Sequence, residues 1–335
     1  METLTAAWAS LHGWVFEKLV EPVVFALGLS TYMEQAFDAT ELFLIGAFEV
    51  ATLALVLSAV ERWKPIEVWA DRSPVRTDVI YTLLQRLGIV PLAIFIALTP
   101  AVDALDGWLR LHDIVPWKLE DAVPALHTQP LASFLVYLVI LDFVAYWLHR
   151  AQHRFEAWWA LHSLHHSQRE MTFWTDDRNH LLDDLIVDGC FALVALAIGV
   201  PPMQFAMILV ATRIVESFSH VNARIHFGRI GEWLLVSPRF HRIHHAIGLG
   251  HEGRVRGCNF ATLFPIWDRL FGTANTDNVY PATGIRDQLH GADYGVGFWR
   301  QQGLGLARLV RALRGAATTP PAYPRATSNL PESTP

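Results

Sequence analysis

Three long apolar stretches constrain the fold of this chain more than any other feature. They cover residues 42–60, 79–101 and 131–148, and the first contains a single charged residue, Glu49. A helix needs about 20 predominantly apolar residues to cross the hydrocarbon core of a bilayer, so each stretch predicts a spanning helix. Because an ionisable side chain that faces lipid is costly, we expect Glu49 to face the interior of a helical bundle.

Two shorter apolar stretches follow further along the chain. Residues 185–199 and 200–218 are joined near Pro201, and the first is too short for a complete crossing. Together they predict a re-entrant or tilted hairpin that returns the chain to the side from which it came. The expected fold class is therefore all-α: an integral-membrane helical bundle of about four spanning or re-entrant helices.

The composition supports a membrane protein and excludes several other classes. Of the 335 residues, 52% are hydrophobic and 17% are charged, which makes the chain more apolar than an ordinary soluble domain. The net charge of −6 and the scattered arginines provide no basic surface for nucleic acid. The two cysteines, Cys190 and Cys258, cannot build a disulfide framework or a C-x-x-C site.

Composition also divides the chain into four parts. The first, residues 1–38, holds an apolar stretch at 11–29 that charges interrupt, which predicts an interfacial or membrane-associated helix. The membrane domain is expected over residues 39–275 and a C-terminal cytoplasmic segment over 276–315. A tail rich in Pro, Ser and Thr, residues 316–335, is expected to be disordered.

Histidines are concentrated in two parts of the sequence that repeat one spacing. Of the 16 histidines, five lie between residues 142 and 166, and three lie within 241–245. Both parts contain the pattern H-x-x-H-H, beginning at His162 and at His241, and the first also contains H-x-x-x-H beginning at His149. Side chains three or four positions apart share one face of a helix. Each set can therefore direct several imidazoles at one point.

Eight clustered imidazoles exceed what one metal ion needs. A single tetrahedral zinc takes four ligands, so two metal ions are the simpler interpretation, and neutral imidazole suits iron, copper, zinc and nickel. A lone histidine on a helix is usually solvated or satisfied in the core, but the repeated spacing argues against that for the whole set. Asp142 and Tyr146 share a helix face with His149, where Asp142 can accept a hydrogen bond from a ligating histidine.

These residues resemble the fatty acid hydroxylase and sterol desaturase superfamily of integral-membrane enzymes over about residues 40–275. The three histidine boxes of that family are matched by His149 and His153, by His162, His165 and His166, and by His241, His244 and His245. Residues 259–273 look like its closing signature. Two shorter elements of that family resemble segments of this chain, namely Arg178-Asn179-His180 and Phe218-Ser219-His220-Val221-Asn222. The sequence departs from the family pattern at Leu181, Asp183, Cys258 and Ala261.

The resemblance implies a di-iron centre that uses O2, and hence a non-haem monooxygenase or hydroxylase, with desaturation as the related outcome. It implies as metal ligands His149, His153, His162, His165, His166, His180, His220, His241, His244 and His245. Residues expected to support these ligands are Asp142, Tyr146 and Asn222. The expected substrate is lipid-like, such as a fatty acyl lipid, a sterol or a carotenoid.

Basic residues are unevenly distributed about the apolar stretches. Residues 1–41 and 102–130 hold three of them, whereas 61–78 and 149–184 hold eight. By the positive-inside rule, the histidine side is expected to be cytoplasmic. Residues 221–273 are mixed and basic, which predicts a cytoplasmic helical cap that carries the di-metal site.

The chain contains no nucleotide, flavin, haem or iron–sulfur motif, so electrons are expected from a separate carrier. A ferredoxin, a rubredoxin or a cytochrome with its reductase would serve, and the basic cap is the expected docking face. The other expected partners are the lipid-like substrate and membrane lipid. Candidates for a substrate channel are aromatic, although core or interfacial packing explains them equally well: Tyr146, Trp147, Trp158, Trp159 and Trp174.

Two other functions compete with an oxygenase. A zinc-dependent membrane hydrolase is disfavoured by the number of ligands and by the absence of an H-E-x-x-H motif. A metal transporter or sensor is disfavoured because the histidines lie just beyond the apolar stretches, whereas transport sites lie near the bilayer midplane. No ligand role is expected for the histidines outside the boxes, which are His12, His112, His127, His226, His251 and His290.

Overall fold

The structure is a computed structural model that describes residues 2–69, 71–115, 117–249 and 256–315. His251 and the tail 316–335 lie outside the described residues. Within these ranges every regular element is a helix, and the β-bridge between Ala246 and Thr283 is isolated. The predicted all-α class is confirmed.

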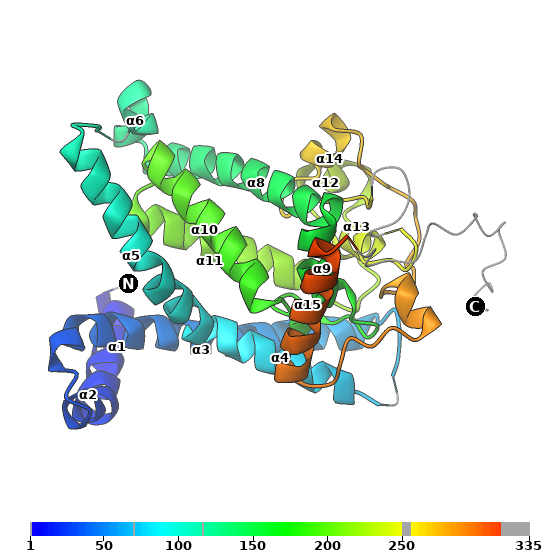
Figure 1. Cartoon of the computed structure of the whole chain (residues 1–335), viewed down its shortest axis with the longest axis horizontal. Coiled ribbons are helices and arrows are strands. Elements are labelled where there is room, and N and C mark those ends of the chain that lie inside the picture. Colours follow the sequence, from blue (N-terminus) through cyan, green and yellow to red (C-terminus); the bar gives the residue numbers. More distant parts are fainter. Residues whose placement is uncertain (1, 70, 116, 250–255, 316–335) are drawn as a thin grey trace.

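Three helices are long and apolar enough to cross a membrane. They are α3 (Met33–Trp63), α5 (Ile89–Leu111) and α8 (Pro130–Arg154), and Figure 1 shows α3 and α8 along the long axis of the molecule. Their most apolar windows are only 11%, 6% and 28% buried, so most of this apolar surface faces outward, as lipid contact requires. The expected count of about four spans stays a prediction.

The second predicted span is wrong in its boundaries. The sequence predicts one helix over 79–101, but the chain turns at Gly88, where φ is 80°, and forms α4 (Ser73–Arg86) before α5. Arg86 explains the difference, because its buried guanidinium bonds Glu49, Asp176 and Asp177 and so keeps the end of α4 inside the protein. Helix α5 then continues to Leu111, beyond the predicted end of the span at residue 101.

Helix α4 approaches α3 closely at Gly46. A Cβ atom at this position would lie 1.7 Å from the carbonyl oxygen of Arg86, so only glycine fits between the two backbones. Glu49 lies one turn further along α3 and pairs with Arg86. The expectation that Glu49 faces the bundle interior is confirmed.

The two shorter apolar stretches form α10 (Leu181–Ile198) and α11 (Pro202–Ser219). They are joined through Gly199, which adopts a φ of 69° that favours glycine. Both helices pack against α8, where Tyr137, Leu141, Val200 and Ile208 form a buried apolar cluster. The hairpin therefore lies beside the third span, and its depth in the membrane stays a prediction.

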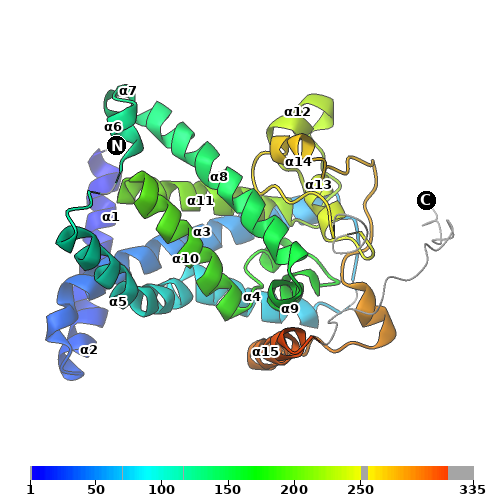
Figure 2. The ribbon, with the colours of Figure 1, turned by 45° about the horizontal axis from the view of Figure 1, so that its top comes forward.

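The remaining helices gather at the two ends of the long helices. The helices at one end are α9 (Glu156–His166), α12 (Gly228–Leu234), α13 (Pro238–His244), α14 (Ile266–Leu270) and α15 (Phe298–Leu313). We call this end the cap, and Figures 1 and 2 show it opposite α1 (Glu2–Val15) and α2 (Glu21–Ala26). The N-terminal helices hold the start of α3, since His12 Nε2 lies 2.9 Å from the Phe37 carbonyl oxygen.

Candidate metal centre

The histidines of the three predicted boxes come together where α8 enters the cap. Nine of the ten expected ligands fall into two groups, and within each group the ligand atoms lie within 4.8 Å of one another. The first group contains His149, His153, His162, His166 and His244. The second group contains His165, His220, His241 and His245.

Each group is built on histidines four positions apart, and this corrects the expectation that one H-x-x-H-H set serves one point. His162 and His166 share the first group, but His165 between them belongs to the second. In α13, His241 and its partner four positions on share the second group, while His244 joins the first. Four residues advance a helix about 40° beyond a full turn, and the third falls about 60° short of it. The third histidine therefore points elsewhere.

The ring nitrogens of the second group nearly touch. The Nε2 atom of His220 lies 3.3 Å from that of His165 and 3.0 Å from that of His241, which is 3.1 Å from Nε2 of His245. All four side chains are buried. Ligands bound at about 2.1 Å to one metal ion are about 3.0–3.4 Å from one another. The spacing of these nitrogens fits a single ion.

Four ring nitrogens of the first group are buried and have no hydrogen-bond partner in the described part of the chain. Among the described residues, Nε2 of His149, His162, His166 and His244 makes no hydrogen bond. Each buried unpaired polar atom costs about 1–3 kcal/mol, a cost that a bound metal ion would relieve. Burial also lowers the pKa of His244 to about 3, which keeps its imidazole in the neutral form that binds metals. The first group therefore fits a metal ion as well.

Backbone carbonyls fix the protonation of three of these histidines. Nδ1 of His149 lies 2.8 Å from the Phe260 carbonyl oxygen, and Nδ1 of His244 lies 2.7 Å from that of Cys258. In the second group, Nδ1 of His220 lies 2.8 Å from a carbonyl oxygen on α11. Because a carbonyl oxygen only accepts hydrogen bonds, each Nδ1 carries the proton and each Nε2 lone pair faces its group.

A carboxylate holds a fourth histidine, and sequence reasoning missed its role. Nδ1 of His162 donates to Oδ2 of Asp183 at 3.2 Å. The other oxygen of Asp183 accepts from Gln152 at 2.9 Å and from the indole of Trp158 at 2.7 Å. In the sequence, Asp183 stands out only as a departure from the family pattern. A carboxylate three residues after His180, in the first turn of α10, was the available signal.

Two buried carboxylates hold residues 258–273 in their fold. This segment carries the carbonyl oxygens that bind Nδ1 of His149 and of His244. Asp268 accepts from the backbone N–H of Phe260 and of Ala261, each at 2.8 Å. Asp142 accepts from the N–H of Leu263 at 2.9 Å. The expectation that Asp142 accepts from a ligating histidine is therefore wrong. It positions His149 indirectly, by holding the segment whose carbonyl binds that ring.

The other two expected supporting residues also act at a distance from the rings. The Tyr146 hydroxyl lies 3.0 Å from Oγ1 of Thr273, at the end of the same segment. The Asn222 side chain accepts from the N–H of Glu67 at 3.1 Å and donates to its carbonyl oxygen at 2.8 Å. Asn222 thus anchors the turn that follows His220, and neither side chain contacts a histidine through a hydrogen bond in the described chain.

His180 lies outside both groups. Its Nε2 donates to the Gln302 carbonyl oxygen at 3.0 Å, and its Nδ1 accepts from the N–H of Leu182 at 3.1 Å. Both ring nitrogens are therefore occupied, one as the N-cap of α10 and one in the contact with α15. The structure does not bring this expected ligand to either group.

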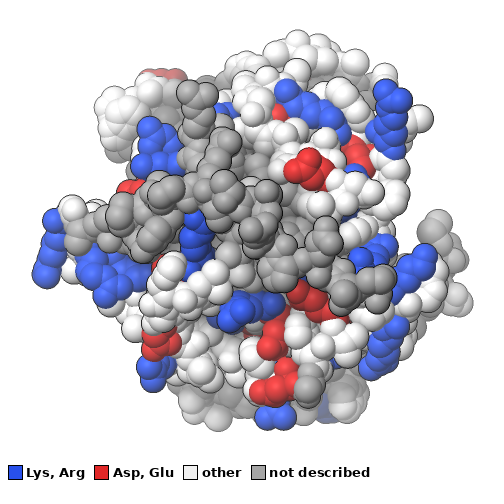
Figure 3. Space-filling view, turned by 90° about the vertical axis from the view of Figure 1, so that its right-hand side faces the viewer, with Lys and Arg blue, Asp and Glu red and all other residues white. Residues whose placement is uncertain are grey.

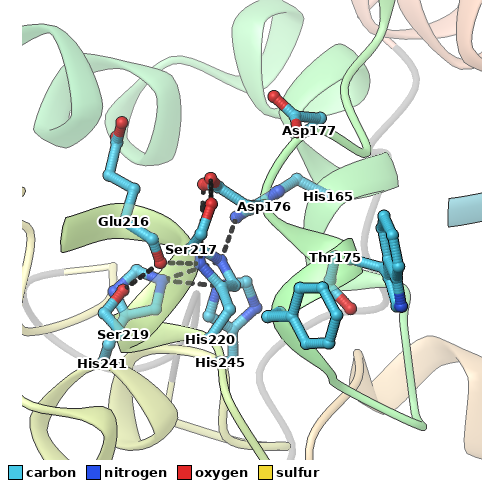
Figure 4. A network of polar contacts seen from close by, with 12 residues as sticks. His165, Thr175, Asp176, Asp177, Glu216, Ser217, Ser219, His220, His241 and His245 are labelled. Atoms are coloured by element: carbon cyan, nitrogen blue, oxygen red, sulfur yellow. Dashed lines mark hydrogen bonds and ion pairs between the residues drawn. The ribbon is translucent and has the colours of Figure 1, made fainter. Parts of the chain in front are cut away.

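A charged network stands behind the second group, and Figure 4 shows part of it. Ser217 donates to Oδ2 of Asp176 at 2.8 Å, and Oδ1 of Asp176 lies 3.6 Å from Nδ1 of His220. Arg86 donates to the same carboxylate at 2.7 Å. The network therefore links His220 to α4 and, through the pairing of Arg86 with Glu49, to the first span.

A cavity of about 230 Å³ reaches both groups from the interior of the bundle. Its lining is mixed. The apolar part comes from three helices and consists of Leu141, Ala145, Leu148, Val187, Phe191, Ile208 and Leu209, and the charged part includes Arg86, Asp176, Asp184, Asp188, Arg213 and Glu216. Its other end is lined by His149, His162, His165, His220 and His241. The aromatic residues expected in a channel, Tyr146, Trp147, Trp158, Trp159 and Trp174, do not line it among the described residues. Phe191 is its aromatic wall.

The fold and this site define a class of protein: a helical membrane protein with a buried histidine centre that fits two metal ions. The family model described as fatty acid hydroxylase matches residues 134–273, a range that contains all nine grouped histidines. The match to this part of the chain, together with the relatives described below, supports a place in the fatty acid hydroxylase superfamily.

Two relatives indicate the breadth of the likeness. Alkylglycerol monooxygenase from Homo sapiens is 32% identical over 148 residues, which are 43% of this chain and 31% of that protein. Ornithine lipid hydroxylase from Rhizobium tropici is 27% identical over 259 residues, which are 76% of this chain and 74% of that protein. The chain thus spans less than a third of the length of the human relative. No solved structure matches it significantly.

Proposed function

We propose that this protein is a membrane-bound di-iron oxygenase that uses O2 and two electrons from an external carrier to hydroxylate a C–H bond of a lipid-like substrate. The observation that carries the proposal is the pair of buried histidine groups, which adjoin at His166 and His245, with ring centroids 4.3 Å apart. The relatives support the reaction class, because their names describe a monooxygenase and a lipid hydroxylase.

The number of ligands favours iron over zinc. Catalytic zinc normally keeps three protein ligands and one open position, whereas the two groups offer five and four histidines. Two iron ions bound there would supply the O2 activation that attack on an unactivated C–H bond requires. The part of the protein is to orient the imidazoles, and Phe260, Cys258 and Asp183 do this through the outer ring nitrogens.

The cavity supports a substrate with a long apolar portion. Leu148, Phe191 and Leu209 come from three different helices and give the cavity an apolar part, against which such a chain would lie near the histidines. A fatty acyl lipid, a sterol or a carotenoid has such a portion, as do lipids of the kinds named in the two relatives. Removal of a second hydrogen, from the neighbouring carbon, in place of hydroxylation would give desaturation.

The electron donor is proposed to dock on the cap. Figure 3 views the molecule from the cap end, where Lys and Arg side chains are spread around the periphery and acidic side chains lie among them. An acidic carrier such as a ferredoxin or a rubredoxin suits a basic face, and a cytochrome with its reductase is the other carrier expected. The cap is proposed to lie on the cytoplasmic side.

Metal and activity measurements on the full chain in nanodiscs test the proposal. We expect about two iron ions per chain, one for each histidine group, and O2-dependent hydroxylation of a lipid when ferredoxin and its reductase supply electrons. His165→Ala should abolish turnover and lower the iron content while the protein remains inserted in the membrane. His226→Ala, a change at an exposed histidine outside both groups, is the matched control and should retain both.

The opposite results are equally definite. One zinc ion per chain, with a product that forms without O2, would identify a hydrolase and overturn the proposal. Full turnover in His165→Ala would remove that residue from the ligand set.

A further inference from the structure

Helix α15 is held on the cap by hydrogen bonds from one of its faces. Nε of Arg308 donates to the Ala160 carbonyl oxygen of α9 at 3.2 Å. Nε2 of Gln302 donates to the hydroxyl of Tyr81 on α4 at 3.0 Å. Helix α9 carries histidines of both groups, and α4 carries Arg86 of the charged network. Contacts with these two helices fix which faces of α15 point outward.

One of these outer faces is apolar. Trp299, Leu306, Val310 and Leu313 are 78%, 47%, 44% and 70% exposed. At about 100° per residue these four side chains lie within about 60° of one another around the helix, and we call them the apolar stripe. A contiguous row of large exposed apolar side chains normally marks a surface that something covers.

The adjacent outer face is basic. Arg300, Arg311 and Arg314 lie on it and are exposed, and α15 contains no acidic residue. Arg300 pairs with Asp293, which precedes the helix, at 2.6 Å. An apolar stripe beside a row of arginines is the pattern of a helix that lies in the surface of an anionic membrane.

The orientation of α15 agrees with this pattern. In Figure 1 the helix runs across the direction of α3 and α8, at the level where these long helices meet the cap. In Figure 2 it lies on the outside of the cap, beyond α9. A helix in the membrane surface stands in this relation to helices that cross the membrane.

The opposite side of the cap has a similar surface. Helices α12 and α14 expose Ile230, Leu234 and Leu270 at 76%, 65% and 64%. Arg229 and Arg269 belong to the same two helices, and Figures 1 and 2 place these helices on the other side of the cap from α15. Apolar side chains mixed with arginines thus occur on two sides at the junction between the long helices and the cap.

We propose that α15 is embedded in the membrane surface, with its apolar stripe among acyl chains and its arginines against anionic lipid head groups. The occupant of this face is lipid, and the proposal does not depend on the hydroxylation proposed above. Helix α15 is also connected to the site. The Gln302 carbonyl oxygen accepts a hydrogen bond from His180 at the start of α10, three residues before Asp183, which binds His162.

Spin labels on α15 test the proposal in the full chain. Cys190 and Cys258 are replaced by alanine, and single cysteines are introduced by Val310→Cys in the stripe and, as a matched control, by Ala307→Cys at an exposed position on the basic side. Each labelled protein is placed in nanodiscs of equal parts phosphatidylcholine and phosphatidylglycerol. Collision of the label with O2, which concentrates in the bilayer, is compared with collision with a water-soluble nickel chelate.

We expect the label at 310 to favour O2 over the chelate severalfold more than the label at 307. Equal collision of both labels with the chelate would overturn the proposal, because the stripe would then face water. Protection of the label at 310 from both reagents would also overturn it, since protein rather than lipid would cover the face. An unchanged metal content in both labelled proteins serves as the control for folding.

The head-group contact is tested in the same nanodiscs. Arg311→Glu combined with Arg314→Glu should lower the severalfold preference at position 310 when phosphatidylglycerol is present. The same double change should have a smaller effect in nanodiscs of phosphatidylcholine alone. An equal effect in the two compositions would refute the anionic-lipid contact. The spin-label measurement uses no substrate, so its result can be interpreted even if the protein does not hydroxylate a lipid.

Discussion

Nδ1 of His162 donates to Asp183 at 3.2 Å, so one carboxylate of α10 orients a histidine of the first group. Partners of this kind fix the ring and raise its basicity, and their loss typically lowers metal affinity or activity about 10–100-fold. We therefore expect Asp183→Asn to lower iron content or turnover by about that factor. Asp184→Asn is the matched control, because Asp184 bonds Gln85 instead of a histidine. Equal behaviour of the two variants would contradict the role assigned to Asp183.

His180 provides a test that separates support from ligation. Because both of its ring nitrogens are hydrogen-bonded to the backbone, His180→Ala should leave the iron content near that of the unchanged protein. It should nevertheless lower the stability by about 1–2 kcal/mol, through the lost N-cap and the lost contact with α15. Iron analysis and thermal unfolding measure the two effects. Loss of one iron per chain would restore His180 to the ligand set.

The close approach of α3 and α4 predicts a difference between two glycines. Gly46→Ala would bring a Cβ atom against the Arg86 carbonyl oxygen, and because backbone atoms cannot turn aside, we expect a cost of about 3 kcal/mol or failure of the protein to accumulate. Gly107→Ala in α5 meets no atom within 4 Å and should be neutral or slightly stabilising. Expression level and melting temperature compare them, and similar values for both would show that the helices can separate.

Asp268 predicts an effect on stability that involves no ligand. Asp268→Ala removes the acceptor for the buried N–H groups of Phe260 and Ala261, and each lost acceptor costs about 1–3 kcal/mol. A fall in melting temperature should be accompanied by weaker metal retention, because the Phe260 carbonyl oxygen would lose its position against His149. Asp277→Ala at an exposed site is the control. A normal melting temperature would mean that the segment is held by other contacts.

Acidification should destabilise the metal-free protein. Burial lowers the pKa of His244 to about 3 and that of His220 to about 4, whereas a solvated imidazole has a pKa of about 6.5. Between these values the unfolded chain binds protons that the folded chain does not, so the free energy of unfolding falls as the pH decreases from about 6.5. Denaturant titrations at several pH values measure this slope.

Two variants check the origin of that slope. His244→Gln removes one of the titrating groups and should make the dependence on pH shallower. His226→Ala changes an exposed histidine and should leave it unchanged. The assignment fails if both variants keep the slope of the parent protein.

Most of what the sequence could predict about the histidine centre came from the spacing of neighbouring histidines. His149 with His153, and His162 with His166, lie four residues apart, and a helix brings such pairs together whatever surrounds it. Which histidines of α13 meet which histidines of α9 depends on how the two helices are placed, and no local pattern specifies that placement. For this reason His165 and His244 were expected with their sequence neighbours and instead belong to the other group.

The partners of the outer ring nitrogens could not be predicted from spacing. The Phe260 carbonyl oxygen that binds His149 is separated from it by 111 residues in the chain, and every residue type supplies an identical carbonyl. The predicted span over residues 79–101, which contains Arg86, was wrong for a related reason. Most residues around Arg86 are apolar, so the sequence predicts one span. Only its distant partners Glu49, Asp176 and Asp177 show why the chain turns there.

His165 and His166 are consecutive residues, yet each serves a different group, and the same is true of His244 and His245. Two single peptide links therefore join the neighbouring histidine groups, and consecutive Cα atoms across such a link are always about 3.8 Å apart. Covalent bonds consequently limit how far the two groups can separate. Bilayers of different thickness could tilt the long helices without pulling the pair apart.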